Sequence, residues 1–340
     1  MTGGAAKDVG GGTIDEAGSC ARVTEALPRG IPRAFAAIAG FVAFAFTLIL
    51  PTSLRDGDTG WHLAAGRWIV DHGRVPAVDP FSFSAAGRAW VAHEWLAEVA
   101  MYAAFHVGGW SGLILLFAVA AGVLYAIMAL HLARILSRPA AVGVLALVSV
   151  GVLPSLLARP HLLALPVLAA WTVALLDARR AGRSPPLAWT ALMLAWANMH
   201  GSFVLGLGLA GAFAFEAVLA ATPAARPGTI RDWSVFGLLA LVAALLTPSG
   251  IEGLLFPIYV SKLQLLAELN EWQPADFSTF SGTEFLLLVT LFILLVRPTR
   301  VPPVRLAVLL ALLHMALQHT RQEMVLVVVG ALLLAEPVGI

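Results

Sequence analysis

The sequence is poor in charged residues. Only 12% of its 340 residues are Asp, Glu, Lys or Arg, whereas 59% are hydrophobic and the mean hydropathy is +0.87. Soluble domains carry roughly 25% charged residues, so this composition excludes an ordinary soluble protein. Several apolar runs approach the roughly 20 residues that a helix needs to cross the hydrocarbon core of a bilayer. The composition therefore predicts an all-α, polytopic membrane protein.

Cysteine and basic clusters are also scarce. Cys20 is alone in the chain, which excludes an intrachain disulfide, a thiolate metal cluster and a CxxC redox pair. The Lys and Arg residues form no basic stripe with interleaved aromatic residues, so nucleic acid is not an expected partner. The segment HEWLAE at 93–98 departs from the HExxH pattern of zinc proteases.

Apolar runs bounded by charged residues, Gly or Pro predict about ten membrane crossings. Residues 1–33 are expected to form a disordered cytoplasmic tail, and residues 34–340 a transmembrane domain. The short run at 187–199 is also compatible with one broken or re-entrant element together with the polar residues that follow it. The predicted crossings are 34–50, 111–133, 139–157, 161–177, 187–199, 202–221, 233–247, 282–296, 304–318 and 323–337.

Arginine recurs in every second connection between these runs. Because positive residues mark the cytoplasmic side of short loops, those connections and the N-terminus are expected to be cytoplasmic. Their arginines are Arg134, Arg138, Arg179, Arg180, Arg183, Arg226, Arg231, Arg297, Arg300 and Arg305. The intervening segments hold most of the carboxylates and histidines, so we expect the functional site on the extracytoplasmic side. These segments are 51–110, 159–161, 198–202, 247–281 and 319–323.

The first extracytoplasmic loop, 51–110, is too polar to cross a membrane but has a regular pattern. Apolar residues recur in it at helical spacing, namely Trp61, Leu63, Ala64, Trp68 and Ile69. This pattern predicts an amphipathic helix over 59–70 that lies at the membrane interface, with His62 on or near its wetter side.

A second interfacial helix is predicted over 93–106 of the same loop. Glu94 and Glu98 are spaced i, i+4 in it, and Trp95 lies on its apolar stripe. Pro, Asp, Ser and Gly are frequent in the intervening segment 75–87, which is typical of turns.

Asp56 and Asp58 follow the first predicted crossing and have three interpretations. Asp is a common helix N-cap, so they could have a capping role alone. A carboxylate at a membrane surface is partly desolvated, which raises its basicity and suits it to general-base catalysis. The two could also bind a divalent cation together with His62, and His93 could complete the ligand set. No other cofactor is indicated.

The order of the polar motifs resembles that of a known group of membrane enzymes. The motifs are D-x-D-x-x-WHL-x-x-G-x-x-I, P-x-x-DPFS, W-V-x-HEWL, RPH, WANMHGS, TPSG and EWQP. From about Phe35 onward the chain resembles a bacterial family of multi-span proteins related to type C glycosyltransferases. The resemblance implies an inner-membrane enzyme that transfers a sugar from a polyprenyl-phosphate carrier to a glycan, lipid or protein acceptor on the extracytoplasmic face.

The same resemblance implies an essential Asp in the first outer loop. Asp58 fits this position best, and Asp56 is the alternative, because Thr59 and Gly60 stand where related branches have an acid and an aromatic patch. Cations must also stabilise the leaving lipid phosphate, and Arg159 with His161 or Arg321 with His319 are the candidates.

The remaining substrate-binding candidates are aromatic, amide, imidazole and carboxylate groups that could hold the sugar. They are Trp61, His62, Trp90, His93, Glu94, Trp95, Asn198, His200, Glu271 and Trp272. Structural roles are the alternatives: Arg159 could reach the lipid headgroups from a helix end, and Asn198 and His200 could hydrogen-bond across a broken helix. Glu271 and Trp272 could anchor an interfacial segment.

Two other functions remain open from the sequence. A transporter or flippase of a lipid-linked or small polar substrate would use a broken helix near Asn198 and the acid Glu216 inside a predicted crossing. A non-catalytic assembly subunit with a type C glycosyltransferase-like fold is the other alternative.

Overall fold

The computed structural model describes residues 30–50, 54–260, 262–263, 266, 268–297 and 299–339. Within these residues the chain is helical, contains no strand, and has one isolated bridge, between Val78 and Ala89. The predicted all-α class is therefore confirmed. Most of the predicted N-terminal tail lies outside the described residues, and its last four residues already belong to the first helix.

The helices follow the predicted crossings closely, since each crossing coincides with one helix. In chain order they are α1 (Gly30–Ile49), α2 (Thr59–His72), α3 (Trp95–Leu132), α4 (Arg138–Val152), α5 (Pro160–Arg180), α6 (Thr190–Ala197), α7 (Phe203–Ala220), α8 (Arg226–Leu245), α9 (Gly250–Val260), α10 (Gly282–Val296), α11 (Pro303–Gln318) and α12 (Glu323–Gly339). Single 3-10 turns lie between them: η2 (Leu153–Ser155), η3 (Leu187–Trp189), η5 (Asn270–Trp272) and η6 (Thr320–Gln322).

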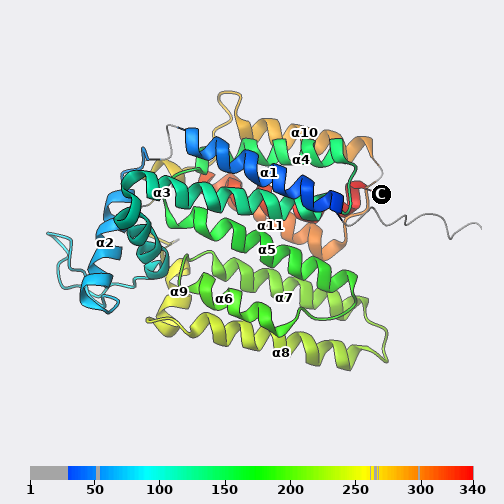
Figure 1. Cartoon of the computed structure of the whole chain (residues 1–340). Coiled ribbons are helices and arrows are strands. Elements are labelled where there is room, and N and C mark those ends of the chain that lie inside the picture. Colours follow the sequence, from blue (N-terminus) through cyan, green and yellow to red (C-terminus); the bar gives the residue numbers. More distant parts are fainter. Residues whose placement is uncertain are drawn as a thin grey trace, which may run out of the picture.

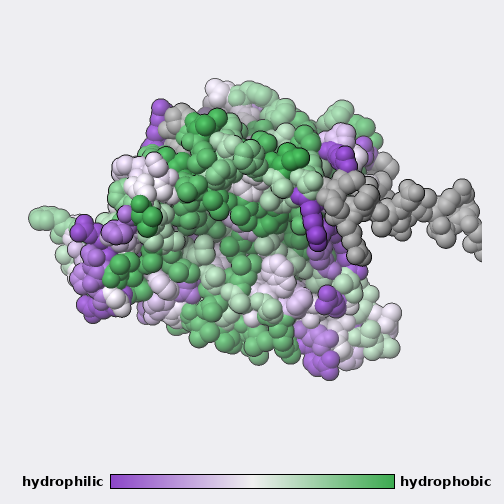
Figure 2. Space-filling view, in the orientation of Figure 1, coloured by the Kyte–Doolittle hydropathy of each residue, from purple (hydrophilic) through white to green (hydrophobic). Residues whose placement is uncertain are grey.

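Length and hydropathy make seven of the described helices able to cross a membrane. Four shorter apolar helices accompany them, at Leu187–Ala197, Gly250–Val260, Gly282–Val296 and Pro303–Gln318. The long helices lie side by side, and α2 packs at one end of the bundle (Figure 1). Figure 2 shows hydrophobic residues across the middle of this face and hydrophilic residues gathered at its two ends. This distribution is typical of a polytopic membrane protein.

Helix α5 forms the centre of the bundle. Trp171 in α5 is fully buried, stacks on Phe236 of α8 with ring centroids 5.5 Å apart, and donates a hydrogen bond of 2.9 Å to the Gly206 carbonyl. Its ring also contacts Trp196 of α6 edge-on at 6.5 Å. These contacts join four helices around one aromatic cluster, and the indole N–H has the partner that burial requires.

Small residues set the closest helix crossings. Helices α1 and α3 pack along each other, and Gly40 faces Gly122 so closely that a Cβ on Gly40 would lie 2.8 Å from the Gly122 carbonyl oxygen. Glycine at such crossings lets two helix backbones approach, which is common between membrane helices.

The predicted interfacial helix in the first loop is α2, and its buried face differs from the prediction. His62 is only 3% exposed, so its predicted position on the wetter side is wrong. The reason is that α2 packs on the start of α3, where the His62 Nδ1 lies 3.2 Å from the Glu98 carboxylate. The contact with Glu98 gives the buried His62 a polar partner on another helix, which the apolar pattern of α2 alone does not reveal.

The second predicted interfacial helix is not separate. It continues into the following crossing as α3, and the two parts meet at a kink at Gly109, whose φ of 58° and ψ of −147° are not helical. Glycine tolerates this conformation without steric cost, so the helix changes direction there.

The opposite end of the bundle is held by buried ion pairs. Glu216 near the end of α7 accepts hydrogen bonds of 3.0 Å from both Nε and Nη2 of Arg305 and one of 3.2 Å from Arg179. Arg305 and Arg180 also pair with Glu336 of α12. The acid inside the predicted crossing is therefore neutralised by two arginines.

The crossing of α2 over α3 yields a test of the fold. A Cβ on Gly66 would lie 2.1 Å from the carbonyl oxygen of Glu98, so Gly66→Ala must push the two helices apart. We expect the substitution to lower the free energy of unfolding by about 1–3 kcal/mol, as overpacking does in other cores. Thermal unfolding of the purified protein in detergent measures this.

Gly60→Ala is the matched control, because Gly60 lies in the same helix and a Cβ there would meet no atom within 4 Å. It should leave the unfolding temperature unchanged. Equal effects of the two substitutions would contradict the described packing of α2 on α3.

Candidate functional site

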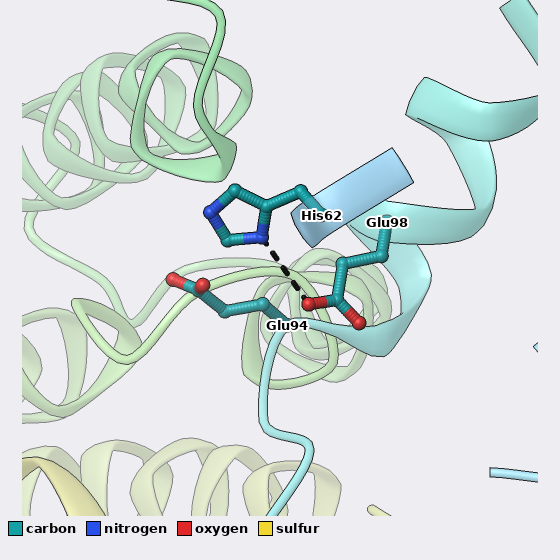
Figure 3. A group of neighbouring side chains, drawn as sticks. All are labelled: His62, Glu94 and Glu98. Atoms are coloured by element: carbon teal, nitrogen blue, oxygen red, sulfur yellow. Dashed lines mark hydrogen bonds and ion pairs between the residues drawn. The ribbon is translucent and has the colours of Figure 1, made fainter. Parts of the chain in front are cut away.

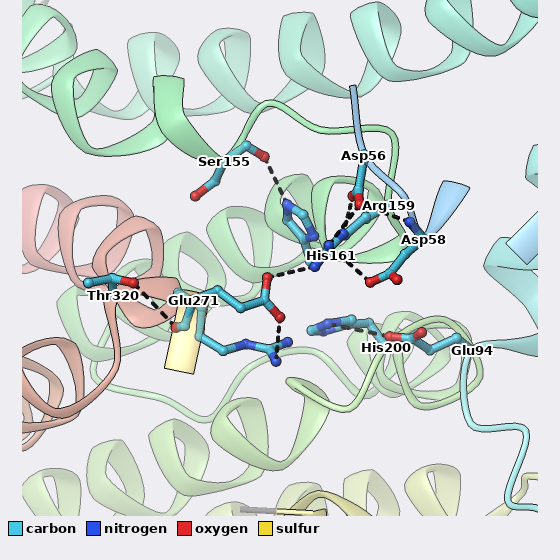
Figure 4. A network of polar contacts seen from close by, with 10 residues as sticks. Asp56, Asp58, Glu94, Ser155, Arg159, His161, His200, Glu271 and Thr320 are labelled. Carbon is cyan, nitrogen blue, oxygen red and sulfur yellow. Dashed lines mark hydrogen bonds and ion pairs between the residues drawn. The ribbon is translucent and has the colours of Figure 1, made fainter. Parts of the chain in front are cut away.

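One end of the bundle gathers the polar residues of the outer segments predicted from the sequence. We call it the site end and define it by residues 54–59, 90–98, 153–161, 196–203, 270–273 and 318–323. The end of α1, the starts of α3, α5, α7 and α12, and the turns η5 and η6 meet there. Figure 4 shows side chains from these separate segments pointing toward one another.

Arg159 is the centre of the site end. It precedes α5, and its guanidinium contacts three carboxylates from two distant parts of the chain. The Nε and Nη2 atoms donate to both oxygens of Asp56, Nη2 lies 2.9 Å from Asp58 Oδ2, and Nη1 donates to Glu271 Oε2 at 2.6 Å. The planar fork of arginine is suited to such multiple pairing.

The two aspartates differ in access to solvent. The Asp56 side chain is 2% exposed, whereas that of Asp58 is 49% exposed. Asp56 also accepts a 3.0 Å hydrogen bond from the Asp58 backbone N–H, so its oxygens are occupied within the protein. Asp58 is therefore the carboxylate that an external ligand can reach.

Burial alone would raise the pKa of Asp56. The hydrogen bonds from Arg159 and from the Asp58 backbone, together with the charge of Arg159, outweigh burial and hold this pKa below its ordinary value. Burial likewise opposes the charged form of Arg159, but its bonds to Asp56 and the charge of Glu271 raise its pKa. Both groups therefore stay ionised at neutral pH.

Glu271 links Arg159 to the segment before α12. Its second oxygen lies 3.3 Å from Arg321 Nη1, and its backbone carbonyl accepts from Thr320 at 3.3 Å. The Arg321 guanidinium lies over the Trp272 ring at 4.5 Å, and His319 Nδ1 contacts the Trp272 carbonyl at 2.7 Å. The predicted residues of η5 and η6 thus form one connected group.

Asn198 connects the turn between α6 and α7 to its neighbours. Its side-chain oxygen accepts from Trp95 at 2.7 Å, and its amide nitrogen donates to the carbonyls of Leu194 and Leu246 at 2.8 and 3.2 Å. Its backbone carbonyl also accepts from Leu96. These contacts give Asn198 the structural role of joining three helices.

A second polar cluster lies beside the first. His62 of α2 and the carboxylates of Glu94 and Glu98 approach so that one ligand atom from each lies within 4.8 Å of the others (Figure 3). Around Glu94 Oε1 lie His93 Nε2 at 3.7 Å and His200 Nε2 at 3.5 Å. We call His62, Glu94 and Glu98 the histidine–glutamate cluster.

Burial decides the charges around this cluster. It lowers the pKa of His62, although the negative charges of Glu94 and Asp58 act in the opposite direction. Burial lowers the pKa of His200 well below its ordinary value, and the charges of the neighbouring His161 and Arg321 act in the same direction. It raises the pKa of Glu94 despite the histidines nearby. The imidazoles of His62 and His200 are therefore neutral at pH 7.

The residues of the predicted cation site, Asp56, Asp58 and His62, contact different groups in the structure. Asp56 and Asp58 contact Arg159, whereas His62 contacts Glu98. Glu98 was not predicted as a site residue. A signal for it was present, since two glutamates at i, i+4 on one helix face repel each other unless another group compensates them.

The two predicted phosphate-binding pairs differ in how many of their nitrogen atoms are already bound to carboxylates. Arg159 is engaged by carboxylates on all three of its nitrogen atoms, and the buried His161 contacts the Ser155 carbonyl at 2.8 Å. Among the described residues, Arg321 makes one ion pair, with Glu271. Arg321 is therefore the better placed of the two arginines to bind an anion.

Comparison of the chain with protein-family models, curated proteins and solved structures found no match.

The lowered pKa of Asp56 generates a pH-dependent test. A carboxylate whose pKa is depressed on folding stabilises the protein fully above its unfolded pKa and loses that contribution as the pH falls through the folded value. We expect Asp56→Asn to cost about 2 kcal/mol of unfolding free energy at pH 7, as charged hydrogen bonds do. The difference from wild type should shrink below pH ~4. Unfolding temperatures measured from pH 3 to 8 provide the comparison.

The control is Asp71→Asn in α2, since Asp71 is half exposed and pairs only with the exposed Arg67 among the described residues. It should match wild type at every pH. A cost for Asp56→Asn that is the same at pH 3 and pH 7 would show that the ion pair with Arg159 is not its source.

Proposed function

We propose that this protein is a membrane glycosyltransferase that moves a sugar from a polyprenyl-phosphate carrier to a glycan, lipid or protein acceptor. The observation that carries the proposal is the geometry of Asp58. It is an accessible carboxylate held 2.9 Å from Arg159, at the edge of a network that also contains Arg321 and Glu271. The motif resemblance of the sequence supports the same conclusion.

Asp58 is the proposed general base. The acceptor hydroxyl attacks the anomeric carbon of the donor, the bond from that carbon to the phosphate oxygen breaks, and Asp58 takes the hydroxyl proton. Arg159 orients the carboxylate, and the buried Asp56 keeps Arg159 in place. In this role Asp56 positions Arg159 and does not contact the reacting atoms.

Arg321 is the proposed cation for the leaving polyprenyl phosphate. It lies over Trp272 and forms one ion pair among the described residues, with Glu271, so phosphate oxygens can bind its other N–H donors. Trp61 and Trp90, whose ring centroids are 6.4 Å apart, offer aromatic surface to the sugar.

A groove next to this region offers a place for the lipid part of the carrier. It has a volume of about 640 Å³ and is lined mainly by apolar side chains of α6, of the start of α3 and of residues 245–248 at and after the end of α8. Trp95 and Asn198 lie at this groove and also belong to the site end. The groove therefore connects apolar surface to the polar network, as an amphiphilic donor requires.

The proposed membrane arrangement has about ten crossings. The seven long helices and the shorter helices α6, α10 and α11 cross, while α2 and α9 lie next to the site end (Figure 1). The opposite end contains Arg134, Arg179, Arg180 and Arg305, so the positive-inside rule makes it cytoplasmic. The site end then faces outward from a bacterial inner membrane.

Glu216 and Asn198, the two residues that favoured a transporter, both have structural partners in the protein. Glu216 is neutralised by Arg179 and Arg305 at the end of the bundle away from the site. The polar groups of Asn198 are satisfied by neighbouring protein groups. Neither residue supports a substrate site halfway across the membrane.

Asp58→Asn tests the proposal. Purified protein in lipid nanodiscs is incubated with radiolabelled polyprenyl-phosphate sugars, and transfer to acceptor and hydrolysis of donor are both measured. Because a general base contributes about 10²–10⁴ in rate, the variant should lose this factor in kcat while its KM for the donor changes little.

Asp71→Asn is again the matched control, an exposed acid of the same loop that should retain full activity. Equally fast transfer by Asp58→Asn would remove Asp58 as the base. Absence of transfer and hydrolysis from every carrier tested with wild-type protein would contradict the proposed enzyme function itself.

A further inference from the structure

The histidine–glutamate cluster is not used by the proposed sugar transfer. Its members come from two helices, since His62 lies in the first turn of α2, Glu94 precedes α3, and Glu98 lies in the first turn of α3. Figure 3 shows the His62 imidazole next to both carboxylates, with its contact to Glu98 dashed. One donor atom from each residue lies within 4.8 Å of the other two.

Glu98 is only partly satisfied. The residue is 1% exposed, and its Oε1 contacts His62 at 3.2 Å, but its Oε2 has no hydrogen-bond partner among the described residues. An unpartnered buried carboxylate oxygen costs free energy, and buried charges in proteins are normally paired or bind metal ions. A bound cation would give this buried carboxylate a second partner beside His62.

The charges of the cluster lead to the same conclusion. Among the described residues Glu94 pairs only with His93 and His200, and Glu98 only with His62. Among the described residues no Lys or Arg forms an ion pair with either carboxylate. The positive charge of Arg321 acts on Glu94 from farther away, and the ion pair of Arg321 is with Glu271. One divalent cation would balance the charges of the two carboxylates.

We propose that His62, Glu94 and Glu98 form a binding site for one divalent transition-metal ion of the zinc or manganese type. One imidazole nitrogen and two carboxylate oxygens suit such ions better than the all-oxygen sites typical of Mg²⁺ and Ca²⁺. Ligands of a tetrahedral zinc ion lie about 3.4 Å apart, given bonds of ~2.0–2.1 Å, so donor atoms that lie within 4.8 Å of one another need to approach by about 1.4 Å at most.

The neighbouring histidines complete the site without serving as ligands. His93 and His200 lie on either side of Glu94 Oε1, where they can orient that carboxylate toward the ion. The ion would cross-link α2 to α3 at the contact where Gly66 packs against Glu98. This site goes beyond the proposed sugar transfer and does not depend on it.

Metal binding to the full-length protein tests the site directly. Protein stripped with a chelator is titrated with Zn²⁺ alone and with Mn²⁺ alone by calorimetry, and metal retained after desalting is quantified by mass spectrometry. We expect about one equivalent of ion and a rise in unfolding temperature that increases with ion concentration, because the ion binds only the folded state.

Glu98→Gln keeps the shape of the side chain and removes its charge, so it should weaken binding by at least tenfold and abolish the thermal shift. Glu94→Gln should do the same and is less buried, so it serves if Glu98→Gln does not fold. Asp71→Asn, which alters an exposed carboxylate of α2 outside the cluster, should bind as wild type does.

Two results would overturn the site. One is wild-type protein that binds neither ion, which would mean that Glu98 is kept neutral by a proton. The other is binding that persists unchanged in both glutamine variants, which would place the ion elsewhere.

Discussion

The ion pairs of Arg159 are the interaction on which the site end depends. This one guanidinium holds Asp56 and Asp58, which follow α1, and Glu271, which lies more than a hundred residues further along the chain. A charged group this buried is stable only when its partners are all in place, because removing one partner leaves an uncompensated charge. Arg159 therefore fixes the position of the Asp58 carboxylate, and through Glu271 and Arg321 it fixes the segment before α12 as well. The proposed chemistry uses groups whose geometry this network determines.

The positions of the helices could be predicted from the sequence because apolar runs and their breaks have a direct physical meaning in a membrane protein. Every predicted crossing coincides with a helix, and α2 begins at Thr59 as predicted. The pattern of apolar residues could not show that two predicted helices form one, α3, or which face α2 buries. Gly109 allows α3 to continue through a kink where two elements were expected, and His62 lies inside because its partner is on another helix. Such contacts depend on tertiary packing, which hydrophobic periodicity does not record.

The candidate site was predictable in part for the same reason. Alternating arginine-rich and acid-rich connections predict which turns share one end of a bundle, so Arg159, His200, Glu271 and Arg321 were grouped correctly with the first loop. Their pairings could not be predicted, because any of several acids could have reached Arg159. The division into an arginine network around Asp58 and a histidine–glutamate cluster around Glu98 arises from burial, which leaves Asp58 accessible while it encloses Glu98.

A double-mutant cycle between Arg159 and Glu271 tests the central role of the arginine network most directly. The unfolding free energies of Arg159→Gln, Glu271→Gln and the double variant are compared with that of wild type in the same detergent. Direct contact at 2.6 Å in a half-buried pair predicts a coupling energy of about 1–3 kcal/mol, with the double variant less destabilised than the sum of the single variants. Effects that add to within about 0.5 kcal/mol would contradict the account, because they would mean that Arg159 does not join these distant segments.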